Sequence, residues 1–471
     1  MLERKADYYF KKITSIPHGS YHEAWLADYI AYFCDEHDYR YVRDEMSNMV
    51  VYAPATKGYE KHEPVALQAH LDMVCESKPG KVFDFDNEPI PLKKAKGYYF
   101  ADGTTLGADD AAGVAIILAI LDECPPHPDL TCIFTVQEEV GLLGVNALDQ
   151  SLINVKKLIS LDDDQFGVTT ISCAGSRYVR LKKDLHPEEN RDPAYRLTVS
   201  GLLGGHSGDE IAHGRANAAL LVARLLKHLL DEGFDVRLAK LYAGQKPNAI
   251  PNFGEAVFAS ISSDDHLQDS LEECFALIQG EYPNDSNIKM SFEEVEWNDV
   301  YPGDESDAII NAIYLNPNGV MTMSPEIKGH PLTSLNLGIA NTENHVATLH
   351  YCVRAENDNE KDFVCDRLST LGYLFGFSVE EFANAGGWRY EKHSPLRKQV
   401  KSLYKQMFKK QMKEVAMHAG LEAGIFKAAH PDLDIVTLGA QLEHIHTYHE
   451  RMNIQSFHDL YRFVKKLLGE L

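Results

Sequence analysis

Five short stretches of the chain carry side chains that can bind metal ions or transfer protons. Each stretch lies at or just past an apolar run typical of a strand, or at the start of a helix. Two zinc ions in a hydrolytic site require imidazoles, carboxylates, one carboxylate that bridges both ions, and a further carboxylate that accepts a proton from metal-bound water. The ordered set therefore predicts a hydrolytic centre with two metal ions. The stretches are His70-Leu71-Asp72, Gly107-Ala108-Asp109, Glu138-Glu139, Leu161-Asp162 and His444-Ile445-His446.

The first two stretches each have a structural and a functional interpretation. A histidine at a strand end can be a core residue that is hydrogen-bonded to its neighbour. In the functional interpretation, His70 binds metal through one ring nitrogen and Asp72 orients the ring, as carboxylates commonly do for ligating histidines. Asp109 is either the N-cap of the alanine-rich helix that follows or the carboxylate that bridges both ions.

Glu138 and Glu139 are adjacent glutamates, a pattern that is common on solvated helix faces. Here they come directly after an apolar run. Two like charges at a buried strand end are costly unless a cation neutralises one of them and the other can hold a proton. We therefore expect Glu139 to bind metal and Glu138 to act as the general base.

The remaining ligand candidates lie in polar clusters. Asp162 begins the acidic run Asp162-Asp163-Asp164, which is typical of a turn, and it is the member nearest the preceding strand. His444, His446 and His449 crowd one loop, where histidines are more often surface residues than ligands. The residue types alone leave both His444 and His446 as candidates for the last ligand.

A further histidine, His206, is flanked by glycines in Gly204-Gly205-His206-Ser207-Gly208. The simplest interpretation of this run is a turn. The glycines would also let the imidazole approach a ligand closely, which suits a group that polarises a carbonyl oxygen in the transition state.

Strands and helices must alternate to position these residues. Strands that alternate with helices indicate an α/β sheet covered on both faces, and in such sheets ligands gather outside the carboxyl ends of the strands. The periodicity predicts helical structure over residues 6–34 and 110–121, a strand over 41–52, and buried strands over 65–69, 130–136 and 157–161, each of these three running into a candidate ligand.

The character of the chain changes after about residue 185. Alternating strands such as residues 195–200 and 345–353, interrupted by a helix over 217–230, indicate an α+β segment. The run Gly386-Gly387-Trp388 then leads to a long helix over 396–413 and a strand over 434–438. We therefore predict a discontinuous α/β catalytic domain, residues 1–185 and 385–471, with an inserted α+β lid domain, residues 186–384.

Composition narrows the class of protein. The 471 residues, 44% of them hydrophobic, are enough for two well-packed cores. The net charge of −24 argues against nucleic acid or an anionic membrane as partner, because phosphate groups would repel the chain. Eight scattered cysteines without a CxxC pair fit reduced thiols, and no apolar run suits a signal peptide or a membrane span. A soluble cytoplasmic protein is expected.

Several motifs closely resemble those of the bacterial aminoacyl-histidine dipeptidases. These enzymes, also called Xaa-His dipeptidases or carnosinase-like enzymes, belong to the co-catalytic zinc peptidase group that includes peptidase T. The resemblance runs in order across nearly the whole chain. It rests on His70-Leu71-Asp72-Met73-Val74, Gly103-Thr104-Thr105-Leu106-Gly107-Ala108-Asp109, Gln137-Glu138-Glu139-Val140-Gly141, Gly204-Gly205-His206-Ser207-Gly208, Asn248-Ala249-Ile250-Pro251, Ser334-Leu335-Asn336-Leu337-Gly338 and His418-Ala419-Gly420-Leu421-Glu422.

The resemblance implies a dipeptidase with two Zn²⁺ per chain, with Co²⁺ or Mn²⁺ as alternatives. Aspartate rather than glutamate at position 162 resembles the aminopeptidase and dipeptidase branches and argues against a carboxypeptidase. His446, followed by Glu450, falls in register with the last ligand, although His444 remains an alternative. The implied metal ligands are His70, Asp109 as the bridge, Glu139, Asp162 and His446.

The resemblance also implies roles for residues that do not bind metal. Glu138 would be the base and Asp72 the orienting acid. His206 would polarise the substrate carbonyl, while Asn248 and Arg354 would bind substrate, the arginine through its bidentate fork. Relatives commonly have asparagine where this chain has Asp110, which either tunes metal affinity or caps the helix.

We therefore expect a metallopeptidase that hydrolyses dipeptides, of the Xaa-His type including β-alanyl-histidine, by attack of a zinc-bound water on the peptide carbonyl. A tripeptidase or an aminoacylase-like amidohydrolase with the same two-metal site is one alternative. A non-catalytic metal-binding scaffold is another, and the second carboxylate beside Glu139 argues against it. The expected partners are a small peptide substrate and, since many relatives dimerise through the lid, a second copy of the chain.

Overall fold

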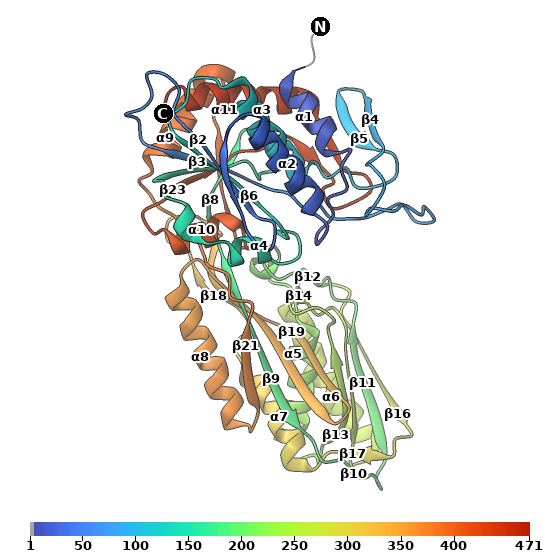
Figure 1. Ribbon diagram of the computed structural model, residues 1–471. Coiled ribbons are helices and arrows are strands. Elements are labelled where there is room, and N and C mark those ends of the chain that lie inside the picture. Colours follow the sequence, from blue (N-terminus) through green and yellow to red (C-terminus); the bar gives the residue numbers. More distant parts are fainter. Residues whose placement is uncertain (1–3) are drawn as a thin grey trace. The chain divides into compact units, whose positions relative to one another are not determined.

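In the computed structural model, which describes residues 4–471, the chain divides into two units (Figure 1). Unit 1 comprises Met1–Cys173, Trp388–Ala416 and Leu421–Leu471. Unit 2 comprises Ala174–Gly387 and Met417–Gly420. The mixed α/β class predicted from the sequence is confirmed, because both units combine helices with sheets. Among residues 4–471, no helix is both long enough and apolar enough to cross a membrane.

Unit 1 is built on a six-stranded sheet with the order β1-β2-β6-β3-β7-β23. The four strands β6, β3, β7 and β23 are parallel, and their inner positions are almost all buried, as expected of strands covered on both faces. Their carboxyl ends therefore meet at one edge. The strands are β1 (Arg40–Arg43), β2 (Met49–Ala53), β3 (Val65–His70), β6 (Leu130–Thr135), β7 (Lys157–Ser160) and β23 (Asp434–Thr437).

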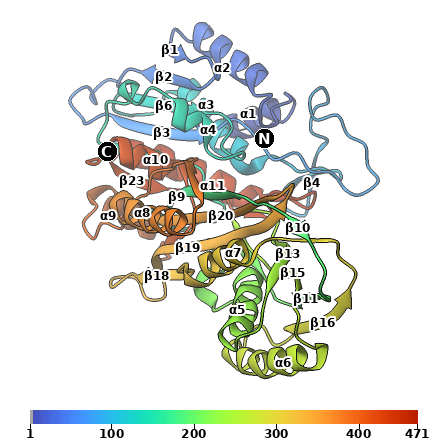
Figure 2. The same ribbon diagram turned by 90° about the horizontal axis from the view of Figure 1, so that it is seen from below.

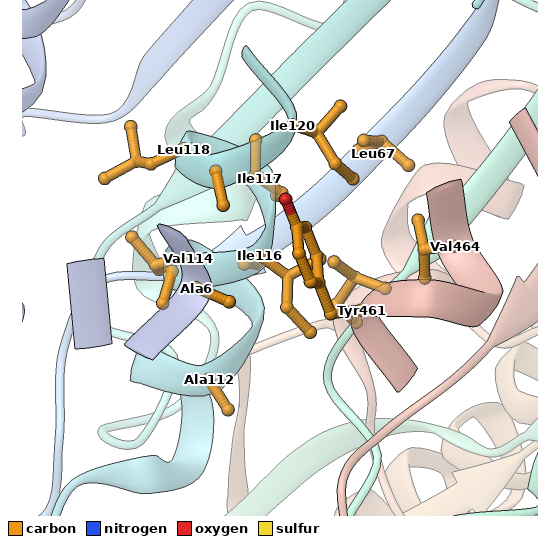
Figure 3. Close-up of a cluster of buried hydrophobic side chains, with 14 of the residues drawn as sticks. Ala6, Leu67, Ala112, Val114, Ile116, Ile117, Leu118, Ile120, Tyr461 and Val464 are labelled. Carbon is orange, nitrogen blue, oxygen red and sulfur yellow. The ribbon is translucent and has the colours of Figure 1, made fainter. Parts of the chain in front are cut away.

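Helix α3 (Ala108–Glu123) forms the centre of the unit 1 core. Thirteen of its residues are buried around the whole helix, which is typical of a helix with neighbours on every side. Figure 3 shows its isoleucines beside Leu67 of β3 and beside Tyr461 and Val464 of the last helix. The other helices of the unit are α1 (Lys5–Ile13), α2 (Ala24–Glu36), α4 (Leu143–Ala147), α9 (Pro395–Phe408), α10 (Glu422–Ala429) and α11 (Ile454–Leu468).

Smaller sheets complete unit 1. A four-stranded sheet has the order β24-β25-β5-β4, and β22 pairs with β8. Strand β25, in the last part of the chain, pairs with β5, which lies in the segment that leads into α3. These strands are β4 (Leu92–Ala95), β5 (Tyr98–Ala101), β8 (Val168–Cys173), β22 (Lys413–Met417), β24 (Leu442–Glu443) and β25 (Arg451–Asn453).

Unit 2 contains a nine-stranded sheet, in which neighbouring strands are antiparallel (Figure 2). Alternate residues of its strands form one apolar cluster with helices α5 to α8, as the period of two in a strand requires. The strands are β9 (Gly175–Asp184), β11 (Ala194–Ser200), β13 (Arg237–Ala243), β15 (Gly254–Ala259), β16 (Lys289–Val295), β18 (Gly319–Met323), β19 (Pro331–Glu343), β20 (Val346–Ala355) and β21 (Ser378–Phe382).

Unit 2 also contains four α-helices, one 3-10 helix (Ile211–His213) and two short ribbons. Helix α5 begins after Asn217, whose side chain accepts hydrogen bonds from the backbone N–H groups of Ala219 and Leu220. The helices are α5 (Ala218–Asp231), α6 (Asp264–Glu281), α7 (Gly303–Leu315) and α8 (Asp358–Leu374), and the ribbons pair β12 (Gly205–His206) with β14 (Ala249–Ile250) and β10 (Glu188–Glu189) with β17 (Asp299–Val300).

Three sequence-based predictions about elements were wrong in detail. The helical stretch 6–34 is two helices, α1 and α2. The stretch 41–52 is not one strand, because β1 and β2 form a hairpin whose turn is held by a bond from the Asn48 N–H to Asp44 Oδ1. The helix predicted over 396–413 ends at Phe408, since Lys409 has a φ of 58° and the next segment is strand β22.

Candidate metal centre and active site

Three neighbouring parallel strands bring candidate ligands to one edge of the unit 1 sheet. Strand β3 ends at His70, β6 is followed within four residues by Glu138 and Glu139, and β7 is followed within two residues by Asp162. Because these strands lie in the order β6-β3-β7, the side chains that follow them gather outside the same edge.

The carboxylate of Asp109 lies between two histidines. Its Oδ1 is 3.1 Å from Nε2 of His70, and its Oδ2 is 3.2 Å from Nε2 of His446. Each histidine also has a second carboxylate beside it: Asp162 Oδ1 lies 3.7 Å from His70 Nε2, and Glu139 Oε1 lies 2.8 Å from His446 Nε2. One aspartate therefore joins two pairs, each made of one imidazole and one carboxylate.

Donor atoms in this region are close enough together to hold metal ions. One group, His70, Asp109 and Glu139, and another, His70, Asp110 and Asp162, each have ligand atoms within 4.8 Å of one another. Imidazole nitrogens combined with carboxylate oxygens suit zinc and the similar divalent metals. The donor set thus fits divalent metal ions.

The charges of the site support the same conclusion. Burial raises the pKa of Asp162 well above its usual value, and the nearby carboxylates of Asp109 and Asp110 raise it further. Although burial opposes its charged form, His70 has a pKa raised well above normal by Asp162, Asp109 and Asp72. Hydrogen bonds to Asp109 and Glu139 raise the pKa of His446 to about 10. The raised pKa values indicate that the buried carboxylates lack compensating positive charge, which bound cations would supply.

Asp72 fixes both a histidine and the loop that follows β6. Its Oδ1 lies 3.5 Å from Nδ1 of His70, and its backbone oxygen lies 3.1 Å from the same nitrogen. The carboxylate also accepts the backbone N–H groups of Glu138 over 2.9 Å and Glu139 over 3.2 Å, and the Ser20 hydroxyl over 2.8 Å. Asp72 thus orients the His70 ring and the backbone that carries both glutamates.

Glu138 has the environment expected of a proton acceptor. The residue is half-buried, and burial raises the pKa of its carboxyl well above the usual value, with further increases from Glu139 and Glu422. A carboxyl group whose pKa is raised toward neutral pH can both accept and release a proton effectively.

The backbone at the start of α3 shows which of Asp109 and Asp110 caps the helix. The N-cap residue is Gly107, and Asp109 and Asp110 have non-helical backbone angles. Asp110, rather than Asp109, makes the bond typical of a cap, since its Oδ1 accepts the Gly113 N–H over 2.9 Å. Its Oδ2 is buried without a hydrogen-bond partner, and the residue belongs to one of the two donor groups. The capping role and a place beside the metals are thus compatible.

The loop histidines differ in their surroundings. His446 contacts Asp109 and Glu139, whereas the backbone oxygen of His444 accepts the Thr447 hydroxyl and its ring lies 6.4 Å from that of His449. The geometry thus favours His446 as the ligand.

In unit 2, the three candidate substrate-binding residues lie together. Nε2 of the half-buried His206 is 3.2 Å from Nη2 of the buried Arg354, and its Nδ1 is 3.1 Å from Asp209 Oδ2. Arg354 Nε also donates to the Ser207 hydroxyl over 3.4 Å. Asn248 adjoins this group, because its backbone oxygen accepts the Ser207 N–H and the next residue pairs with His206.

Two buried glutamates near the ligands were not assigned a role from the sequence. Glu422 accepts hydrogen bonds from Gln68 Nε2 over 2.5 Å and from the Thr135 hydroxyl over 2.7 Å. Glu450 accepts backbone N–H groups from the segment before Asp109. Glu422 ends the motif His418-Ala419-Gly420-Leu421-Glu422, and Glu450 follows His446 by four residues. The local sequence does not indicate the hydrogen-bond partners of either glutamate.

Comparisons with known proteins show the family of the chain. A family model described as "Peptidase family M20/M25/M40" matches residues 66–470. The cytosol non-specific dipeptidase of Escherichia coli (strain K12) is 34% identical to this chain and aligns with 98% of it and 96% of its own length. The crystal structure of aminoacylhistidine dipeptidase from Vibrio alginolyticus is similar with a TM-score of 0.91, at 31% identity, over 99% of this chain and 96% of that one. Aminopeptidase PepT from Bacillus cereus, at 15% identity and a TM-score of 0.56 over 99% and 98% of the two chains, shares the fold. The resemblance drawn from the sequence motifs is confirmed.

Proposed function

Since the chain belongs to peptidase family M20/M25/M40, we propose that it is a metal-dependent dipeptidase whose active site is the cluster around Asp109. The observation that carries the proposal is the position of this carboxylate, with one oxygen beside His70 and the other beside His446. A bridging carboxylate flanked by two imidazole–carboxylate pairs is the arrangement that two catalytic metal ions need.

We assign the ligands of the two ions from the contacts. His70, Asp162 and Asp109 would hold one ion, and Asp109, Glu139 and His446 would hold the other. We propose Zn²⁺ for both, with Co²⁺ or Mn²⁺ as substitutes, because the donors are imidazoles and carboxylates. When bound, the ions would polarise the peptide carbonyl and lower the pKa of a water molecule.

The protein's own groups would then move the protons. Glu138 accepts a proton from the water that attacks the peptide carbonyl and passes it to the leaving amine. Its raised pKa suits both steps, since a carboxylate that binds a proton firmly enough to accept it can still release it to an amine. Asp72 keeps Glu138 in place through the backbone N–H of that residue.

We assign substrate recognition to the cluster in unit 2. Arg354 would bind the substrate carboxylate through its planar guanidinium, and Asn248 would form a polar contact with the dipeptide. His206 would polarise the carbonyl oxygen through its imidazole ring, and Asp209, whose Oδ2 lies 3.1 Å from Nδ1, orients that ring.

We propose dipeptides of the Xaa-His type, β-alanyl-histidine included, as the substrate class. The solved relative is named an aminoacylhistidine dipeptidase and the curated relative a non-specific dipeptidase, so the two names predict different breadths of substrate. The curated relative is described as cytosolic, which supports a cytoplasmic location for this chain. We also propose a homodimer through unit 2, on the family resemblance.

A rate panel tests the proposal. Zinc-loaded protein would be assayed with Xaa-His and other dipeptides, tripeptides and N-acyl amino acids, with chelator-treated protein and Glu138→Gln as controls. The proposal predicts chelator-sensitive hydrolysis of dipeptides, lost in Glu138→Gln and weak with the other classes. Faster hydrolysis of tripeptides or N-acyl amino acids would replace the assigned substrate, and no hydrolysis of any compound would contradict the enzyme assignment.

A further inference from the structure

Glu450 lies outside the proposed ligand set but binds three consecutive backbone N–H groups. Leu106 and Gly107 donate to its Oε2 over 2.9 and 3.0 Å, and Ala108 donates to its Oε1 over 2.8 Å. The residue is 3% exposed. Because both carboxylate oxygens are used, the contact fixes the direction of this backbone as well as its position.

The three donors belong to the segment that enters α3. The first N–H groups of a helix have no partner inside the helix. Successive N–H groups next to a residue with positive φ form a concave site for an anion, and Gly107 has a φ of 68°. A Cβ atom at Gly107 would lie 2.6 Å from the sulfur of Met73, so the position needs glycine on both grounds. The anion in this site is a carboxylate that lies 342 to 344 positions away along the chain.

Other contacts join the same two segments. Strand β25 begins at Arg451, directly after Glu450, and pairs with β5, where Arg451 lies opposite Phe100. On the other side, His446 precedes Glu450 by four residues and reaches Asp109 Oδ2 over 3.2 Å. Asp109 itself follows Ala108 directly. The strand pairing, the Glu450 carboxylate and the His446–Asp109 contact therefore connect the two segments at three successive points.

We propose that Glu450 is a positioning residue of the metal centre, which holds the backbone before the bridging Asp109 in register with the loop that carries His446. The proposal rests on the proposed metal site, since it assigns Glu450 a role in setting the distance between two of its ligands. Glu450 contacts neither substrate nor metal ligand side chains in this role. It acts through the backbone that precedes Asp109 and through its own position four residues after His446.

Another carboxylate of unit 1 supplies a matched control. Asp434 accepts the Leu396 N–H over 2.9 Å and the Ser394 hydroxyl over 2.5 Å at the start of α9. It opens strand β23, so it lies at the amino end of a parallel strand, whereas the ligands follow carboxyl ends. Asp434→Asn therefore removes a similar bond between a carboxylate and a helix start without touching a ligand segment.

The test compares metal affinity, kcat and KM in Glu450→Gln, Asp434→Asn and the unaltered protein. Glu450→Gln keeps the shape of the side chain but turns an NH₂ group toward backbone donors. We expect it to weaken binding of zinc by roughly 10- to 100-fold in competition with a chelator, as loss of a partner that orients ligands does. We also expect kcat to fall, KM for the dipeptide to stay within about twofold, and excess zinc to restore part of the activity. Asp434→Asn should lower thermal stability while zinc affinity and kcat stay unchanged.

Two outcomes would overturn the proposal. The first is a folded Glu450→Gln protein with unaltered zinc affinity and kcat, and the second is an equal loss of affinity in Asp434→Asn. If Glu450→Gln does not fold, Glu450→Asp, which keeps the charge on a shorter side chain, replaces it. This variant should bind zinc more weakly than the unaltered protein, and an unaltered affinity would overturn the proposal. Unaltered protein that binds two zinc ions but hydrolyses no peptide would contradict the proposed function and leave this comparison valid.

Discussion

The ligand edge of unit 1 and the His206 cluster of unit 2 place their functional groups on different kinds of backbone. At the ligand edge, His70 ends a buried parallel strand, and Glu139 follows another within four residues. In unit 2, His206 lies in a two-residue strand between glycines, and Gly204 and Gly205 have φ values of 63° and 119°. The sheet therefore fixes His70, Glu139 and Asp162 among the proposed ligands, whereas a local turn fixes the position of His206.

The hydrogen-bond partners differ in the same way. Backbone N–H groups beside the ligands donate to the buried carboxylates of Asp72 and Glu450. The exposed Asp209 and the side chain of Arg354 hold the ring of His206. We therefore expect metal affinity to be sensitive to changes in unit 1, whereas changes in the cluster of unit 2 should lower kcat and leave metal affinity unchanged.

Glu138→Gln should have the largest effect. The variant should keep both metals, because Glu138 is not a ligand, and lose kcat by on the order of 10²- to 10⁴-fold, the usual contribution of a general base. Metal content by elemental analysis and kcat on the best dipeptide measure the two quantities. Retention of full activity would place the base elsewhere and remove Glu138 from the account.

His446→Ala, compared with His444→Ala, separates two neighbours in one loop. Of these two histidines, His446 is the one that contacts Asp109 and Glu139. Its loss should weaken binding of one zinc ion by more than about 100-fold, which exceeds the usual cost of losing a residue that only orients a ligand. His444→Ala should change zinc affinity less than about threefold, since surface changes usually cost little. Isothermal titration with zinc gives both values, and the opposite ranking would make His444 the ligand.

His206→Ala tests the unit 2 side of the comparison. We expect kcat to fall by on the order of 10²-fold, as for loss of one donor to a developing oxyanion, with zinc affinity unchanged. His213→Ala is the control, since His213 is also a histidine of unit 2 bonded to a nearby carboxylate, Glu210 Oε2 at 2.7 Å. Loss of metal from His206→Ala, or an unaltered kcat, would contradict the assigned role.

His350 should give the smallest effect, on stability alone. Burial and the nearby Arg180 lower its pKa from 6.5 to about 4. The folded state therefore resists protonation, so stability is present above pH 6.5 and is lost as pH falls toward 4. Since one pKa unit corresponds to about 1.4 kcal/mol, the loss between pH 7 and pH 5 should be about 1 to 2 kcal/mol.

His350→Phe supplies the comparison for that effect. Tyr178 and Phe382 have rings 5.6 and 5.3 Å from the imidazole, so an aromatic substitute suits the site. Urea denaturation at both pH values should show a smaller loss of stability in the variant. Equal losses in the two proteins would show that His350 does not titrate as described.

The sequence predicted where the buried strands end, but it did not predict which distant segments contact each other. The apolar runs before His70, Glu138 and Asp162 predicted β3, β6 and β7 because burial on both faces leaves a continuous apolar pattern. The stretch 41–52 was misinterpreted because two short strands and their turn shared one alternating pattern. The hydrogen bonds of Glu450 and Glu422 join residues far apart along the chain, which local periodicity does not encode.

X-ray diffraction at the zinc absorption edge, from crystals of zinc-loaded protein, would locate the bound metal ions. The account predicts two anomalous peaks on opposite sides of the Asp109 carboxylate. His70 and Asp162 should coordinate one of them and Glu139 and His446 the other, at about 2.0 to 2.2 Å from nitrogen and oxygen. A single peak, or peaks away from these five side chains, would contradict it.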